Sequence, residues 1–266
     1  MKRSNYSLIT SVALSALLAV GGPSMAFANA EKGLEIATER KARDEGWGDS
    51  IATMQMVLKN AQGESSTREM RMKSFEVADD GDKGLTIFDQ PRDVKGTAFL
   101  NHSHTIDADD QWLYLPALKR VKRISSRNKS GPFMGSEFAY EDLSSFELEK
   151  YTFTYLRDEE FGGSNTFVVE QVPTDKNSGY TKQQVWLDKE HYRPMQVEFY
   201  DRKGSLLKTL KFDDYQLYLD KYWRAHTMAM TNHQTGKSTL LTTSDLQFQT
   251  GLRARDFEKN ILKRVK

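Results

Sequence analysis

Gln111-Trp-Leu-Tyr-Leu-Pro-Ala-Leu-Lys-Arg-Val-Lys-Arg-Ile124 opens the stretch that decides the fold, and a glycine-containing segment follows it as far as Ser145. Its first part predicts a strand that ends at Pro116, because proline cannot donate a hydrogen bond to a sheet ladder. A second short strand is expected over residues 119–124. The loop after it carries large apolar side chains between glycines, and such side chains usually cover an apolar site. We therefore predict a lid formed by Phe133, Met134 and Phe138.

Outside this stretch, apolar and polar residues alternate in short segments that are separated by turn residues. The alternation predicts strands at 51–58, 68–75, 84–88, 96–102, 151–155, 166–172, 181–187, 194–200, 206–212, 222–231 and 238–248. Many strands joined by short turns are typical of an antiparallel meander. So wide a sheet must curl or close. The sequence therefore predicts a mainly β protein built as a barrel or part-barrel.

Three helical segments are expected among these strands. The first runs from Glu31 to Glu45, with Leu34 and Ala37 on its apolar stripe and Ile36 off that stripe. A short helical turn is expected from Tyr140 to Ser145. A C-terminal helix is expected from Asp256 to Lys263, capped by its aspartate.

Residues 1–30 have the pattern of a secretory signal peptide. Lys2 and Arg3 precede an apolar run over residues 8–20, and Ala28-Asn29-Ala30 supplies a small-x-small cleavage site. The alternative is an uncleaved anchor, but the run is short for a span of about 20 residues. We expect cleavage after Ala30 and one domain over residues 31–266 in the periplasm.

Composition narrows the class of protein further. The chain has 266 residues and no cysteine, which excludes lipid attachment to an N-terminal cysteine. Charged residues make up 28% of it, so the body of the protein is expected to be soluble and monomeric. The 38 basic and 37 acidic side chains nearly balance, and this balance argues against a nucleic-acid partner.

No catalytic signature stands out, and we predict neither an enzyme nor a bound cofactor. His102 and His104 lie two apart near several aspartates, a spacing that two metal ligands on one strand face would have. A polar strand end running into an acidic turn is the favoured interpretation, so no metal site is predicted. Gly-rich phosphate motifs and a nucleophile elbow are absent from the sequence.

Methionine is the most informative residue type. Six methionines form same-face pairs on three predicted strands, and methionine suits surfaces that adapt to irregular apolar guests. The alternative is an ordinary barrel core filled by its own side chains. The predicted ligand cavity comprises Met54, Met56, Met70, Met72, Met195, Met228 and Met230, with Tyr151, Phe153 and Tyr155 as a rigid wall.

The short basic strand carries Lys119, Arg120, Lys122 and Arg123. Successive side chains alternate across a strand, so these charges fall on both faces and cannot all enter an apolar cavity. We therefore predict an edge strand or a protruding hairpin. Its charges either protect the edge from aggregation or dock on an acidic partner or an anionic membrane surface.

Three ordered motifs resemble a known family: Pro91-x-x-Val94-x-Gly96-Thr97-Ala98-x-Leu100, then Trp112-Leu113-Tyr114-Leu115-Pro116-Ala117-Leu118-x-Arg120-Val121-x-Arg123-Ile124, then Phe133-Met134-Gly135-Ser136-x-Phe138-x-Tyr140-x-Asp142-Leu143. They are similar to the outer-membrane lipoprotein-sorting family of LolA-like periplasmic carriers. The resemblance implies a curved antiparallel sheet that forms an incomplete, half-open barrel, with a few helices across the open side as in LolA and LolB.

The resemblance also implies a function. Relatives hold the acyl chains of lipids or lipoproteins in an apolar cavity, and some accompany inner-membrane exporters of the resistance-nodulation-division type. We therefore expect a soluble carrier of a lipid or acylated lipoprotein that hands its cargo to such an exporter or to an outer-membrane acceptor. The alternative is a sensor or adaptor of the same fold that binds a protein partner without shuttling cargo.

Overall fold

A single antiparallel sheet dominates the computed structural model, which describes Met1 and residues 23–264. Most of the predicted signal peptide, residues 2–22, lies outside the described residues. The strands are β1 (Asp49–Lys59), β2 (Ser65–Phe75), β3 (Lys83–Gln90), β4 (Ala98–His102), β5 (Asp110–Leu115), β6 (Arg120–Ile124), β7 (Tyr151–Phe161), β8 (Ser164–Pro173), β9 (Tyr180–Asp188), β10 (Pro194–Asp201), β11 (Leu206–Tyr218), β12 (Tyr222–Asn232) and β13 (Ser238–Phe248).

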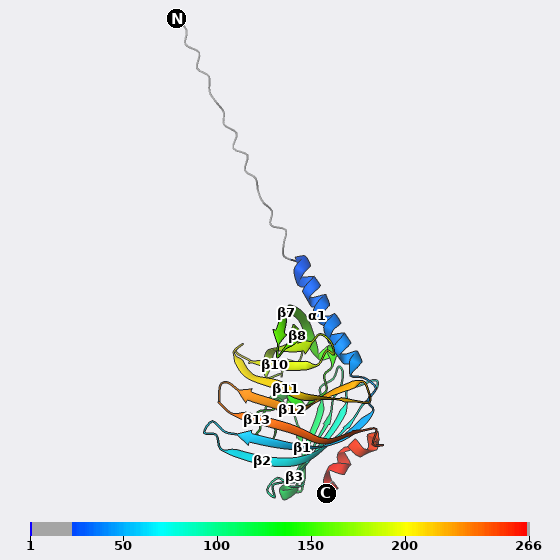
Figure 1. The fold of residues 1–266 in the computed structure, drawn as a ribbon. Helices are drawn as coiled ribbons and strands as arrows, with labels where there is room; N and C mark the ends of the chain where they lie inside the picture. The colour runs from blue at the N-terminus through cyan, green and yellow to red at the C-terminus, as the bar shows by residue number, and fades with distance from the viewer. Residues whose placement is uncertain (2–22, 265–266) are drawn as a thin grey trace.

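Strand order explains why the sheet curls without closing. Strands that follow one another in the chain pair antiparallel, except β6 and β7, and β1 also pairs with β13. The order therefore runs β6-β5-β4-β3-β2-β1-β13-β12-β11-β10-β9-β8-β7. The two strands at the ends of that order, β6 and β7, are the edges. Figure 1 shows the strands curving around a common interior with α1 beside β7 and β8. The predicted half-open barrel and the predicted edge position of the basic strand are both confirmed.

The chain between β6 and β7 is made of short 3₁₀ turns. The 3₁₀ helices of the described chain are η1 (Pro116–Leu118), η2 (Ser126–Asn128), η3 (Phe133–Gly135), η4 (Tyr140–Leu143), η5 (Leu148–Lys150), η6 (Ala254–Phe257) and η7 (Lys259–Lys263). The helical turn predicted at Tyr140 is thus confirmed as η4.

The C-terminal segment is helical, as predicted, but it does not form one continuous helix. The segment forms η6 and η7, two 3₁₀ helices that meet at Glu258, whose extended backbone interrupts the helix. The Asp256 carboxylate accepts a hydrogen bond from the backbone N–H of Arg253 at 2.8 Å. Asp256 lies within η6, so it is not the residue that precedes the helix, as the predicted cap would be.

The α-helix of the described chain, α1 (Pro23–Arg43), presents a different face from the one predicted. Leu34 is 50% exposed, whereas Ile36 and Ala37 are 4% and 2% exposed. The close approach of α1 to β7 decides which face of the helix is buried, because a Cβ atom on Gly33 would lie 2.7 Å from the backbone nitrogen of Tyr155 in β7. The helix therefore turns its glycine toward β7, and the residues three and four positions further on are buried with it.

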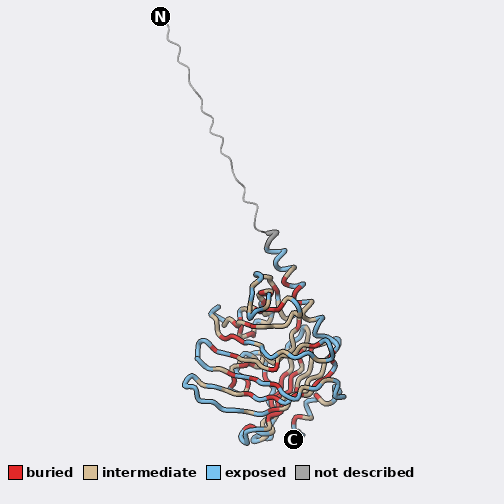
Figure 2. Tube along the Cα trace, in the orientation of Figure 1, coloured by how far each residue is buried: buried red, intermediate tan, exposed pale blue. Residues whose placement is uncertain are grey.

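Two apolar clusters form on the two faces of the sheet. The larger one fills the concave side and joins α1, the β6–β7 segment and most strands. The smaller one lies on the outer side of β3, β4 and β5, where Phe257 and Leu262 of the C-terminal segment are fully buried. Figure 2 shows buried positions along the middle of the strands and exposed turns at the sheet margin. Both faces of the sheet are thus covered in part.

A buried ion pair fastens the β6–β7 segment to the far side of the sheet. Lys208 of β11 donates to a carboxylate oxygen of Asp142 at 2.6 Å and to the carbonyl oxygen of Glu137 at 2.8 Å. The two side chains of the pair are 4% and 5% exposed. The Tyr180 hydroxyl donates to the second carboxylate oxygen of Asp142 at 2.7 Å. A segment of short 3₁₀ turns is therefore attached to the sheet by a network in which the buried polar groups hydrogen-bond one another.

We expect Lys208→Met to destabilise the protein by about 3–5 kcal/mol, because it leaves the Asp142 carboxylate buried without its cation. Lys211→Met, at an exposed position of the same strand, is the matched control and should change stability by about 0.5 kcal/mol or less. Urea unfolding followed by circular dichroism measures both. Equal stability of the two variants would contradict a structural role for the pair.

Candidate ligand cavity

A cavity of about 1340 Å³ lies on the concave side of the sheet. Residues from the end of α1, from the central strands β1, β2, β11, β12 and β13, and from the turns at their ends line it. Its apolar strand residues include Ala52, Met54, Met72, Phe212, Met228 and Leu246. Small-molecule sites commonly measure about 300–1,000 Å³, so this cavity is large enough for a bulky guest.

The predicted methionine pairs share the concave face. Strand register places Met54 opposite Met70, and Met228 opposite Leu241 of β13. Met54, Met72 and Met228 line the cavity. Met56, Met70 and Met230 lie beside them in the packed cluster and are 1%, 2% and 0% exposed. Three of these methionines therefore line the cavity, as one alternative predicts, and the other three fill the packed core, as the second alternative predicts.

The predicted aromatic wall lies elsewhere. Tyr151, Phe153 and Tyr155 belong to the apolar cluster, in the strand that α1 crosses. The Phe146 ring stacks on Tyr151 with 6.1 Å between centroids, and Lys32 of α1 lies 3.5 Å from the centre of the Tyr155 ring. Met195 is half-buried and belongs neither to the described cluster nor to the residues lining the cavity.

The loop predicted as a lid occupies the core. Phe133 and Phe138 are 2% and 3% exposed, and the Phe133 ring lies 5.2 Å from that of Phe99 between centroids. Met134 is half-buried, and its carbonyl oxygen accepts a hydrogen bond from Arg68. None of these three loop residues is among the described residues that line the cavity.

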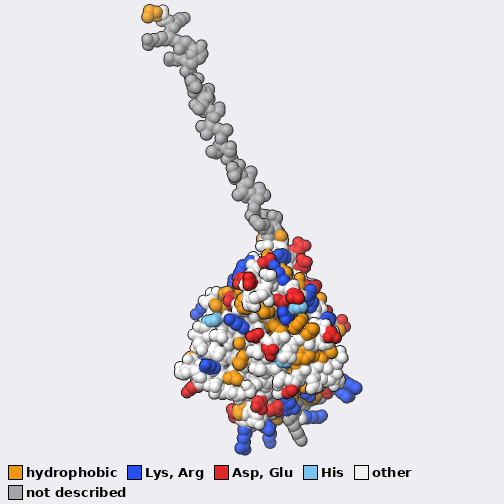
Figure 3. All heavy atoms as spheres, in the orientation of Figure 1, with side chains coloured by type: hydrophobic (Ala, Val, Ile, Leu, Met, Phe, Trp, Pro, Cys, Tyr) orange, Lys and Arg blue, Asp and Glu red, His pale blue; other side chains and the backbone are white. Residues whose placement is uncertain are grey.

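The basic residues of β6 are accessible. Arg120, Lys122 and Arg123 are exposed, and so is Lys119, which ends η1 and lies just before the strand that was predicted to include it. Arg123 forms an ion pair with Asp110 of the neighbouring strand. Val121 packs against the outer cluster that the C-terminal segment completes. Figure 3 shows basic side chains projecting at the end of the molecule where the C-terminus lies.

The two histidines considered as metal ligands have other partners. The His102 ring lies 2.7 Å through Nε2 from the carbonyl oxygen of Phe257, and the His104 ring lies 2.7 Å through Nδ1 from a carboxylate oxygen of Asp80. Within residues 23–264, no group of three His, Asp or Glu side chains could hold a metal ion. The partners of the two imidazoles thus come from the C-terminal segment and from the β2–β3 turn.

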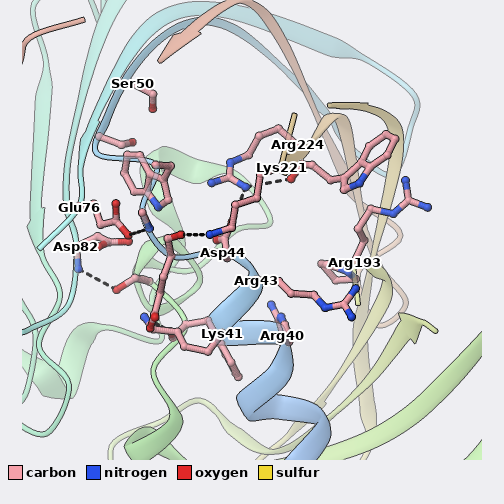
Figure 4. Close-up of a pocket in the computed structure, with 18 of the residues that line it drawn as sticks. Arg40, Lys41, Arg43, Asp44, Ser50, Glu76, Asp82, Arg193, Lys221 and Arg224 are labelled. Atoms are coloured by element: carbon pink, nitrogen blue, oxygen red, sulfur yellow. Dashed lines mark hydrogen bonds and ion pairs between the residues drawn. The ribbon is translucent and has the colours of Figure 1, made fainter. Parts of the chain in front are cut away.

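Charged side chains of both signs line the cavity. Figure 4 shows Arg40, Arg43 and Arg193 gathered on one side and Glu76 and Asp82 on the other. Sequence reasoning did not single out these rim residues, because they come from α1, the β9–β10 turn and the β2–β3 turn, which are far apart in the chain. The one available signal was the basic last turn of α1, which contains Arg40, Lys41 and Arg43.

Most rim cations already have an anionic or carbonyl partner. Arg224 contacts a carboxylate oxygen of Asp44 at 2.5 Å, and Lys221 donates to the carbonyl oxygen of Glu45 at 2.6 Å. Lys41 pairs at 2.9 Å with Glu147, a carboxylate that is 1% exposed. These contacts tie the end of α1 to β12, to the turn before it and to the β6–β7 segment, so they hold the helix over the cavity.

Asp82, on the acidic side of the cavity, has a raised pKa. Its pKa is raised from 3.8 to about 6, chiefly by burial and in smaller part by the carboxylates of Glu147 and Glu76, while a backbone hydrogen bond and Lys41 oppose the shift. Because the folded-state pKa lies above the unfolded value, Asp82 contributes stability below about pH 4. That contribution is lost as pH rises through about 6.

We therefore expect Asp82→Asn to stabilise the protein at pH 7.5 by about 2 kcal/mol and to have little effect at pH 4, because the amide keeps the acceptor without the charge. Thermal melts at the two pH values measure the difference. Asp79→Asn, at an exposed position of the same turn, is the control and should show no such pH dependence. A gain of the same size at both pH values for Asp82→Asn would contradict the shifted pKa.

Solved structures show what this geometry resembles. A Vibrio parahaemolyticus structure named as an outer membrane lipoprotein-sorting protein domain is 82% identical, with a TM-score of 0.88, and covers 89% of this chain and 100% of its own. A DUF1329 family protein from Desulfovibrio piger is 27% identical, with a TM-score of 0.84 and coverage of 88% and 99%. A LolA superfamily protein from Nitrosomonas europaea shares the fold at 19% identity, with a TM-score of 0.68 and coverage of 86% and 98%.

A family model also matches the chain. A family model described as "Uncharacterized protein" covers residues 80–264. No curated protein matches the chain. No helix in the described part of the chain is both long and apolar enough to cross a membrane. The resemblance found in the sequence motifs is confirmed by the Vibrio structure at 82% identity over most of the chain. The chain belongs to the outer-membrane lipoprotein-sorting protein family, and its fold is that of the LolA superfamily.

Proposed function

We propose that the protein is a soluble periplasmic carrier that binds the acyl chains of a lipid or lipidated protein and delivers them to a membrane acceptor or exporter. The observation that carries this proposal is the cavity of about 1340 Å³ between α1 and the methionine-lined face of the open sheet. Flexible, polarizable side chains fit irregular acyl chains, and an unclosed sheet leaves a route for a long guest. Membership of a lipoprotein-sorting family supports the same function.

The location follows from the proposed processing. Cleavage after Ala30 would leave Glu31 as the first residue and shorten α1 to its part over β7 and the cavity. Gly33, Ile36 and Ala37 all lie in that part, so the helix keeps its buried face. Release of the shortened chain by osmotic shock would support a free periplasmic protein, and recovery of the full chain in membranes alone would contradict it.

We expect Met72→Asp to lower the affinity for a fluorescent fatty acid at least tenfold, because an unpaired charge in an apolar site is strongly unfavourable. Met72 is half-buried at the cavity wall, so water reaches the new carboxylate in the empty protein and folding should persist. Met195→Asp, half-buried away from the lining, is the matched control. Unchanged binding by a folded Met72→Asp variant would remove the cavity assignment.

The proposed second site is the basic edge strand β6. Each basic residue near an anionic surface can contribute about 1 kcal/mol, and screening over about 8 Å at physiological ionic strength makes such a contact sensitive to salt. Arg120 and Lys122 are exposed and have no ion-pair partner among the described residues. We therefore assign them to docking on an anionic membrane surface or an acidic partner.

The double variant Arg120→Glu, Lys122→Glu should fold and bind lipid normally but transfer it several-fold more slowly to acceptor vesicles that contain anionic lipid. The wild-type rate should fall with added salt, while the variant rate should change little. Stopped-flow transfer of a fluorescent lipid measures both. A normal, salt-sensitive rate in the double variant would leave β6 with edge protection alone.

The alternative function is that of a sensor or adaptor of the same fold that binds a protein partner without shuttling cargo. Native mass spectrometry of protein taken from its own periplasm separates the two. About one lipid per chain supports the carrier, and a protein complex with an empty cavity supports the adaptor.

A further inference from the structure

Arg40 differs from the other cations at the cavity. It belongs to the last turn of α1, is half-buried and lines the cavity. Arg43 has Glu39 at 2.7 Å, and Arg193 has Asp188 at 2.8 Å. The guanidinium of Arg40 has neither an ion pair nor a hydrogen bond within the part of the chain that the structure describes. It is therefore a cavity cation whose donors are free.

The surroundings of Arg40 are aromatic rather than acidic. Its guanidinium lies 4.1 Å from the centre of the Phe146 ring, which stacks on Tyr151. The nearest influential carboxylate is Asp44, which is already engaged by Arg224. Burial lowers the pKa of Arg40, and the hydroxyls of Tyr215 and Tyr151 lie near enough to affect it. A cation in such a place is unfavourable until an anion joins it.

Tyr151 stacks on Phe146 but is not among the described residues that line the cavity. Its hydroxyl makes no hydrogen bond with any described residue. The hydroxyl of Tyr215, by contrast, donates to the carbonyl oxygen of Pro194 at 2.5 Å. Among the described residues, the Arg40 guanidinium beside Phe146 is thus a cavity-lining donor that remains unpaired.

We propose that the cavity binds an anionic amphiphile, with its carboxylate or phosphate on Arg40 and its alkyl chain along Met54, Met72 and Met228. This assignment rests on the carrier function proposed above and specifies its ligand class. A guanidinium matches the two oxygens of a carboxylate or phosphate with parallel hydrogen bonds. The apolar side chains that line the same cavity then take the chain, so one space satisfies both parts of the ligand.

The test compares ligands that share one chain and differ in head group. Binding of laurate, dodecyl phosphate and uncharged dodecanol is measured by calorimetry below their aggregation concentrations, with inorganic phosphate as the probe without a chain. The proteins are the wild type, Arg40→Gln and the matched control Arg43→Gln, whose arginine already has Glu39 as a partner. Arg40→Lys, which keeps the charge but not the planar fork, is the second variant.

We expect the wild type to bind laurate or dodecyl phosphate at least tenfold more tightly than dodecanol. Arg40→Gln should lose that preference and retain its affinity for dodecanol, Arg40→Lys should keep part of it, and Arg43→Gln should keep it in full. Whichever of laurate and dodecyl phosphate is preferred identifies the head group. The melting temperature of empty Arg40→Gln should equal or exceed that of the wild type, because an unpaired cation has been removed.

Two results would overturn the assignment while leaving the carrier function in place: equal wild-type affinity for all three dodecyl ligands, or an unchanged anion preference in Arg40→Gln. Inorganic phosphate binding as tightly as dodecyl phosphate would also overturn it, because the site would then recognise an anion without a chain. Failure of every dodecyl ligand to bind would instead contradict the carrier proposal itself.

Discussion

Burial of the concave face of an unclosed sheet is the constraint on which the rest of this structure depends. The order of thirteen strands ends at β6 and β7, so the interior that a closed barrel would seal remains open along one side. Apolar surface facing water is unfavourable by about 25 cal/mol per Å². The chain covers most of this face with α1 and with the long segment between the two edge strands, and each cover needs its own attachment because neither joins the sheet ladder.

The two covers are attached in different ways. Gly33 lets α1 approach the backbone of β7 closely, and Lys41 pairs with the buried Glu147 at the other end of the helix. The β6–β7 segment is held instead by the Phe133 ring in the core and by the buried Lys208–Asp142 pair. The cavity is the part of the concave face that the two covers leave unfilled, and both contribute residues to its lining. Its charged rim follows from this arrangement, because the end of α1 brings Arg40 to the edge of an apolar surface.

Much of the sheet was predictable from the chain alone. Alternation with period two locates a strand and assigns its two faces, since side chains of a strand point alternately to opposite sides. Hence the methionine pairs on β1, β2 and β12 could be placed on one face before any contact was known, and register confirms that Met54 lies opposite Met70. The basic residues of β6 indicated an edge for the same reason, because charges on both faces are incompatible with a central strand between two packed layers.

Sequence by itself thus determined the sheet, its unclosed form through the family motifs, and the face on which each methionine lies. Tertiary structure alone decided which side of α1 is buried, since backbone contact at Gly33 outweighs the larger apolar surface of Leu34. It also decided that Phe133 and Phe138 fill the core. A loop of apolar residues between glycines can either cover a cavity or pack into the core, and only its tertiary contacts distinguish the two. The cavity rim was equally hidden. Arg40, Phe146, Arg193 and Asp82 are remote in the chain, and only the curvature of the sheet and the crossing of α1 bring their charges and rings to one space.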